Sequence, residues 1–129
     1  MNLIQYIFVY REMNKEKDIL VCKLQDSLVK MGRKALWSYD QSNLPEKISD
    51  KIIIEKILLF GDINNWQDLK KAYSIEYIKD VWLQNMALGG FHPEKQEQIA
   101  QYFFKINNLP AFLVEYRDNY INDLVERAF

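Results

Sequence analysis

Residue types that build recognisable sites are scarce in this chain of 129 residues. It has one cysteine, Cys22, and one histidine, His92. One cysteine cannot form an internal disulfide, and a single Cys and His cannot supply the four ligands of a structural zinc site. We expect Cys22 to be a buried structural thiol. Because nothing in the cysteine pattern indicates a secreted, disulfide-linked fold, we expect a cytoplasmic protein.

Glycine is also scarce, and its four copies form no phosphate-binding loop. The pair Gly89–Gly90 lacks the spacing of dinucleotide and P-loop motifs and is typical of a turn. No serine lies in a nucleophile-elbow pattern. No arginine stands between Gln84 and Phe91, ahead of His92, as the Arg-then-His pattern of helical ribonuclease toxins requires. We therefore predict no catalytic residue, cofactor, metal or small-molecule ligand, and a protein that is not an enzyme.

Neither a charge excess nor a long apolar run is present. The chain has 17 basic and 18 acidic residues, a net charge of -1, so there is no global attraction to nucleic acid or to acidic membranes. The apolar run Leu3 to Tyr10 is shorter than the about 20 residues that span a bilayer, and it lacks the flanks of a signal peptide. We expect no membrane partner. Residues 1–12 can be read as an appended segment of undetermined structure, which leaves residues 13–129 as a single helical domain.

What the chain does have is helical periodicity. An apolar spacing of four and three predicts a helix over residues 18–31, ended by Gly32. Ser49 and Gly61 are typical of the two ends of a second helix, although its isoleucine-rich run could also form a strand. The prediction of the first helix rests on the apolar residues Leu20, Leu24, Leu28 and Met31.

Three or four further helices follow. Asn64 or Asn65 can cap one that carries Trp66, and Ser74 can cap the next. Pro93 opens another helix, and Pro110 opens the last one, whose apolar stripe is Leu113, Tyr116, Tyr120, Leu124 and Val125. The predicted fold is all-α, a compact bundle of five or six short helices joined by short loops.

The two helices between residues 64 and 85 match the length of a helix-turn-helix, which raises DNA binding as an alternative function. The turn lacks glycine, and the second helix has no excess of bases over the acids Glu76 and Asp80, so a hairpin that only builds the core is the simpler interpretation. The candidate nucleic-acid contacts are Lys70, Lys71, Tyr77, Lys79 and Gln84.

A partner surface is the leading functional interpretation, because tyrosine is favoured at interfaces. The candidates are Tyr116 and Tyr120 on the last helix, for which packing into the chain's own core is the more frequent outcome. Trp37, Tyr39 and Asp40 form a second candidate surface. We predict that all three tryptophans, Trp37 included, are core residues.

The string Ala35 to Asp40 (ALWSYD) resembles the opening of a small, uncharacterised bacterial family classed as a domain of unknown function. The similarity continues through the apolar helix ending in Gly61–Asp62, the Trp66 helix pair and the aromatic helix from Pro93, over about residues 33–106. At the start of that helix this chain has His92, Pro93 and Glu94, where most members have Ser-Pro-Lys. The resemblance implies an antitoxin-like partner of a nucleotidyltransferase-type toxin, and it assigns no catalytic residues.

Overall fold

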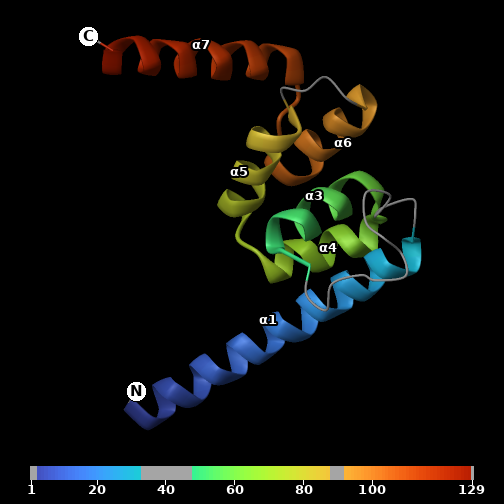
Figure 1. Ribbon diagram of the computed structural model, residues 1–129. Helices are drawn as coiled ribbons and strands as arrows, with labels where there is room; N and C mark the ends of the chain where they lie inside the picture. The colour runs from blue at the N-terminus through green and yellow to red at the C-terminus, as the bar shows by residue number, and fades with distance from the viewer. Residues whose placement is uncertain (1–2, 33–47, 88–91, 129) are drawn as a thin grey trace. The chain divides into compact units, whose positions relative to one another are not determined.

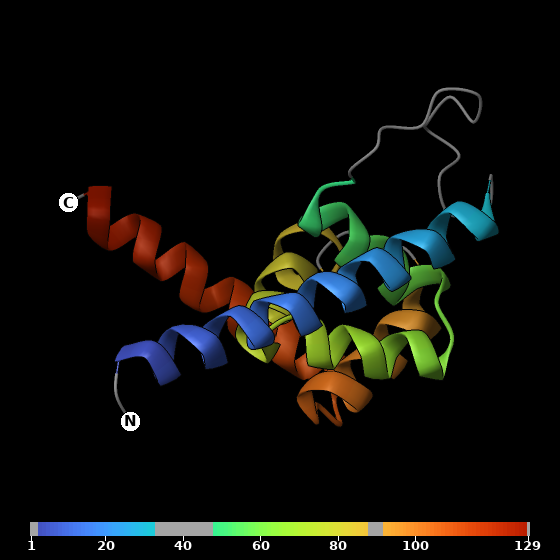
Figure 2. The same ribbon diagram turned by 90° about the horizontal axis from the view of Figure 1, so that it is seen from below.

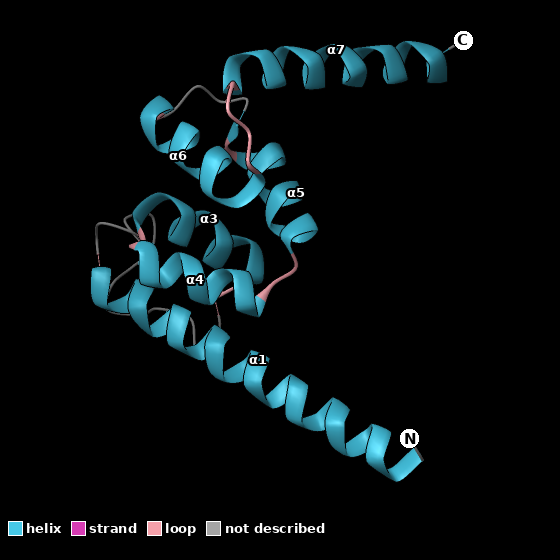
Figure 3. Cartoon of the chain, turned by 180° about the vertical axis from the view of Figure 1, so that it is seen from behind, coloured by secondary structure: helices cyan, strands magenta, loops and turns pink. Residues whose placement is uncertain are grey.

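The computed structural model describes residues 3–32, 48–87 and 92–128, and the regular elements in these ranges are all helices (Figures 1 and 3). The predicted all-α class, with five or six helices, is therefore confirmed for the described part of the chain. The helices are α1 (Leu3–Met31), α3 (Asp50–Phe60), α4 (Ile63–Ala72), α5 (Ile75–Asn85), α6 (Pro93–Phe104) and α7 (Leu109–Ala128).

The chain divides into two compact units, Met1–Ile78 and Lys79–Phe129. The first contains α1, α3 and α4, and the second contains most of α5 with α6 and α7. This division does not test whether the chain folds as a single domain, which stays a prediction, as does the interpretation of residues 1–12 as an appended segment.

Helix α1 begins at Leu3, and the prediction that it starts near residue 18 is wrong. Residues 11–17 contain no glycine or proline and several good helix formers, so nothing interrupts the helix between the apolar run and the predicted start. Figures 1 and 2 show this N-terminal half extending beyond α3 and α4. The predicted end is confirmed, since Gly32 takes the left-handed conformation of a helix cap, with φ 59°.

The first unit packs α1 against α4 and α3. The side chains of each helix that face this core are fully buried, and each contributes on the order of 1.5–3 kcal/mol to stability. They include Leu24 and Leu28 of α1, Ile53, Ile54, Ile57 and Leu58 of α3, and Leu69 of α4. The predicted strand alternative for the isoleucine run is therefore not adopted.

The ends of α3 are the predicted ones. The Ser49 hydroxyl accepts a hydrogen bond from the Ile52 amide at 3.4 Å. Gly61 ends the helix by donating its amide to the Ile57 carbonyl at 2.8 Å. A Cβ at position 61 would lie 2.6 Å from that carbonyl oxygen. Only glycine allows this close approach without a shift of the backbone.

Helix α4 is capped by Asp62, not by the predicted Asn64 or Asn65. The Asp62 carboxylate accepts the Asn65 amide at 2.9 Å, and the Asn65 side chain accepts the Asp62 amide at 3.0 Å. This reciprocal pair is a capping box, with Asn65 at the third helical position. Asn65 thus contributes to the helix start, but as the second half of the box.

The second unit is built around Trp82 of α5, which is fully buried. Its ring lies 4.9 Å from that of Phe104 and 6.3 Å from that of Phe112. Its indole Nε1 donates to the Gln96 side-chain oxygen at 2.7 Å. The predicted core positions of Trp66 and Trp82 are confirmed, whereas Trp37 lies outside the described residues.

The turn from α6 to α7 is closed by backbone hydrogen bonds and a side-chain cap. Helix α6 ends at Phe104, and Lys105 adopts the left-handed conformation with φ 55°. The Ile106 amide then donates to the Ala100 carbonyl at 3.1 Å, which gives one of the last carbonyls of the helix a partner. Asn108 accepts the Ala111 amide at 3.1 Å and so caps α7, one residue before Leu109.

Candidate partner-binding surface

Helix α7 is attached to its own unit through its first two turns. Leu109 is buried, and Phe112, Leu113 and Tyr116 are half-buried. The Phe112 and Tyr116 rings stack with centroids 6.5 Å apart. The C-terminal half of α7 extends past α5 and α6 of the same unit (Figures 1 and 3). The helix therefore has an anchored part and a projecting part.

Helix α7 carries apolar side chains that are exposed, most of them on its projecting part. Each of five residues on α7 is between 48% and 57% exposed. They are Val114, Tyr120, Ile121, Leu124 and Val125. The prediction that the stripe of the last helix packs into the core is wrong for Tyr120, Leu124 and Val125, which are exposed because the helix continues beyond α5 and α6 of its own unit.

The two predicted partner tyrosines differ in their surroundings. Tyr116 is half-buried against Phe112, whereas Tyr120, one turn later, is exposed. Val114 and Ile121 were missed at the sequence level. Their signal was present, because Val114, Ile121 and Val125 recur at spacings of seven and four, which marks a second apolar face of the same helix. The other predicted partner residues, Trp37, Tyr39 and Asp40, lie outside the described residues.

Half of the charged residues of α7 lie on its other side. Glu115, Asp123 and Glu126 share a polar face with Asn119 and Asn122, and this face carries no lysine or arginine. Helices that lie on membrane surfaces are rich in lysine and arginine on the polar face. The composition of α7 therefore favours a protein partner over an anionic membrane.

The predicted nucleic-acid residues are not alike in environment. Lys70, Lys71 and Gln84 are exposed, and Tyr77 is half-buried with its ring 6.0 Å from that of Tyr73. The Lys79 ammonium lies 5.9 Å from the Phe104 ring and 5.3 Å from the Phe112 ring. Such cation–π contacts hold the charge against its own unit.

The helix pair proposed as a helix-turn-helix is joined by only two residues, Tyr73 and Ser74, where three or four are usual. Ser74 caps α5 as predicted, accepting the Tyr77 amide at 3.2 Å. The exposed positions of α5 include Glu76 and Asp80. An acidic outer face repels phosphate, so the charge pattern of α5 does not favour DNA reading.

Cys22 is exposed, which corrects the prediction of a buried thiol. It lies on the same side of α1 as Ile19 and Lys23, which are exposed as well. His92 is also exposed and precedes α6 with φ 51°, without capping it through its side chain. His92 therefore occupies the N-cap position of α6 by its backbone alone.

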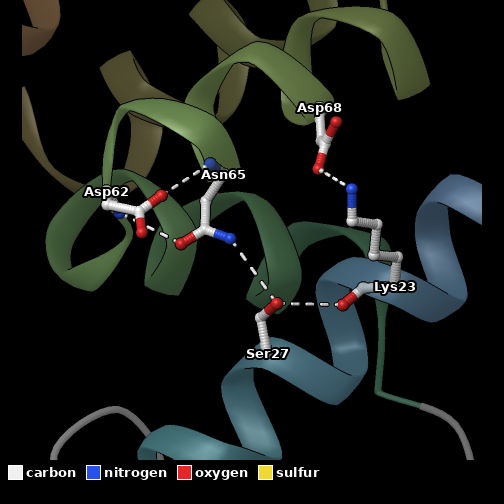
Figure 4. Close-up of polar contacts among 5 residues, drawn as sticks. All are labelled: Lys23, Ser27, Asp62, Asn65 and Asp68. Carbon is white, nitrogen blue, oxygen red and sulfur yellow. Dashed lines mark hydrogen bonds and ion pairs between the residues drawn. The ribbon is translucent and has the colours of Figure 1, made fainter.

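A polar contact between α1 and α4 was also missed (Figure 4). Asp68 is buried and forms an ion pair with the Lys23 ammonium at 3.0 Å. The Ser27 hydroxyl of α1 donates to the Lys23 carbonyl at 3.1 Å and accepts from the side-chain Nδ2 of Asn65 at 3.5 Å. These contacts set how α4 lies along α1, and we assign them a structural role.

Among the described residues, Tyr73 is the one whose pKa is clearly shifted. Burial, and then its hydrogen bond to Asp50 at 2.6 Å, raise the pKa of Tyr73 above its usual value of 10.0. The Lys17 ammonium lies 5.5 Å from the ring centre. A neutral, anchored phenol of this kind stabilises the packing of α4 and is unsuited to proton transfer near neutral pH.

In the ranges that the structure describes, no three His, Cys, Asp or Glu side chains come together as metal ligands. Among the same residues, no helix is both long enough and apolar enough to cross a membrane. Comparison of the chain with family models, with characterised proteins and with solved structures finds no match. The resemblance to the bacterial family therefore stays a prediction.

Proposed function

We propose that this protein is a non-enzymatic interaction protein and that it acts by binding another protein through α7. The observation that supports the proposal is the uncovered apolar surface on the projecting part of that helix, centred on Tyr120 and Leu124. A helix of about three turns is marginal by itself in water, and Asn, Asp, Val and Ile are weak helix formers. A partner that covers this surface would stabilise the helix it binds.

The chemistry of the surface indicates the kind of partner. An amphipathic helix with tyrosine and leucine on one side fits an apolar groove on a folded protein. Following the resemblance, we propose a nucleotidyltransferase-type toxin as that protein, with this chain as its antitoxin-like partner. Its location in the cytoplasm is part of the same proposal.

Affinity capture with matched variants tests the proposal. The tagged full-length chain is incubated with nuclease-treated lysate of the cells that make it, beside Tyr120→Ser/Leu124→Ser and the control Asn122→Ser/Glu126→Ser. We expect wild type and control to recover one protein in near-equal amount, and the Tyr120/Leu124 variant to recover at least about tenfold less. Equal recovery by all three would contradict binding through α7.

The identity of the captured protein tests the finer part. A nucleotidyltransferase-type enzyme would support the antitoxin-like role. Specific capture of an unrelated protein would overturn that role and leave the interaction through α7 in place.

A further inference from the structure

The apolar side of α7 that contacts the second unit continues past that unit. At about 100° per residue, five of its residues lie within a sector about 120° wide and form one stripe along the helix. We call them the continuous stripe. They are Phe112, Leu113, Tyr116, Tyr120 and Leu124. The first three are half-buried and the last two are exposed, so the unit covers only the N-terminal half of the stripe.

We propose that this coverage is autoinhibitory. The second unit holds the half of the continuous stripe from Phe112 to Tyr116, and a partner that binds Tyr120 and Leu124 binds more tightly when that half is released. The charge of Lys79 sets how firmly α7 is held. This inference rests on the proposed function, because it describes the regulation of the same helix.

The spacing of the stripe explains why release would strengthen binding. A helix that lies in an apolar groove contacts it through residues three, four and seven positions apart. Tyr120 and Leu124 alone provide a single spacing of four. With Leu113 and Tyr116 the series has spacings of three, four and four, and it extends over about three turns. The exposed half is therefore only part of the surface that such a groove binds.

Lys79 and Trp82 of α5 hold the covered half. They lie three positions apart, on one side of the helix, and both contact the rings of Phe104 and Phe112. The Lys79 ammonium lies 5.9 Å and 5.3 Å from the centres of these two rings. The Trp82 ring lies 4.9 Å and 6.3 Å from them. Phe112 in turn stacks on Tyr116, with 13° between the ring planes. Lys79 is thus a positioning residue, which acts on α7 through Phe112.

The turn between α6 and α7 allows the helix to move away. The hydrogen bonds that close the turn are each local to one helix. On the α6 side the Ile106 amide donates to the Ala100 carbonyl at 3.1 Å. On the α7 side the Asn108 side chain accepts the Ala111 amide at 3.1 Å. A change of backbone angles at Asn107, between the two, would release α7 and leave both bonds in place.

Amide hydrogen exchange of the full-length chain tests the Lys79 contact without any partner. Lys79→Gln removes the charge, and Lys79→Arg keeps it in a group that also stacks on aromatic rings. Lys71→Gln, at an exposed lysine of α4, is the control. A single helix released into water is only marginally stable, so the amides of α7 exchange faster when it is released.

We expect exchange over residues 109–116 to be about three- to fivefold faster in Lys79→Gln than in wild type, because the contacts of the cation with the rings are lost. Lys79→Arg and the control should stay within about twofold of wild type. Residues 95–103 of α6 should be unchanged in every variant. Unchanged exchange over 109–116 in Lys79→Gln overturns the proposal. An equal increase over α6 does the same, because it would indicate a general loss of stability.

Capture from nuclease-treated lysate tests the regulation, with the tagged chain too dilute to deplete the partner. A released fraction that is three- to fivefold larger lowers the apparent Kd by the same factor, so Lys79→Gln should recover about three- to fivefold more of the captured protein than wild type. Recovery equal to or below that of wild type overturns autoinhibition and leaves the proposed function in place. Recovery of no protein by any of the chains overturns the proposed function, and this inference with it.

Discussion

The indole rings of Trp66 and Trp82 combine burial with a satisfied nitrogen. Trp66 is 7% exposed, and its Nε1 donates to the Ile57 carbonyl at 3.0 Å, in the same turn of α3 that Gly61 closes. The ring therefore connects α4 to the end of α3 by packing and by a hydrogen bond. Removing it would leave a cavity and one buried carbonyl with fewer partners.

Trp66→Ala should lower the free energy of unfolding by about 3–5 kcal/mol, because both the ring and its contacts are lost. Trp66→Phe keeps part of the ring volume and should cost less. Chemical denaturation of the three proteins measures the difference. A loss near zero for the alanine variant would show that the ring is not part of the core.

Tyr73 makes the stability of the first unit sensitive to alkaline pH. Its pKa is raised in the folded chain, so the neutral form is stabilised by folding. That contribution is complete below the unfolded pKa of about 10 and is lost as pH rises above it. We expect the unfolding free energy to fall above pH 10 more steeply for wild type than for Tyr73→Phe.

The phenylalanine variant should also be about 1 kcal/mol less stable at neutral pH, because the hydrogen bond to Asp50 is lost. Denaturation curves recorded from neutral to alkaline pH measure both effects. Parallel curves for the two proteins above pH 10 would rule out Tyr73 as the titrating group.

At the scale of the element, the start of α4 distinguishes Asp62 from Asn64, although both residue types are favoured as N-caps. Asp62 and Asn64 are both good caps by type, but only Asp62 stands at the boundary with its carboxylate on the Asn65 amide. Asp62→Ala should cost about 1 kcal/mol of stability, and Asn64→Ala should be close to neutral. Thermal unfolding of both variants checks this order, and a reversed order would place the helix start two residues later.

The ends of the helices show which features of the fold could be predicted from the sequence. Ser49, Gly61 and Ser74 mark helix ends through local backbone chemistry, and these positions were predicted correctly. The start of α1 and the exposure of Tyr120 were predicted wrongly. Both depend on how far a helix continues beyond its neighbours, which apolar spacing does not encode.

For the candidate site, the sequence singled out Tyr116 and Tyr120 but not Val114 and Ile121. Val114 and Ile121 have the spacing of a buried face, so their pattern alone cannot distinguish a core from a contact surface. Asp68 is the opposite case, because an isolated carboxylate gives no sign of the Lys23 that meets it from another helix.

At the scale of the whole molecule, the near-zero net charge and the acidic positions of α5 argue against nucleic-acid binding. The full chain should bind duplex DNA no more tightly than about 10⁻⁴–10⁻⁶ M, the range of non-specific contacts. Fluorescence anisotropy at several salt concentrations measures this. Tight binding that weakens with salt, and that Lys70→Glu/Lys71→Glu abolishes, would favour the DNA-binding alternative over our account.

The central claim, that α7 contacts another protein through its apolar surface, is tested most directly inside the cells that make the protein. A photoreactive phenylalanine analogue replaces Tyr120 in one variant and Asn122, on the polar face, in another. We predict that irradiation links position 120 to a protein, identified by mass spectrometry, and that position 122 gives no such product. Absence of a product at position 120, or equal products at both positions, would contradict the claim.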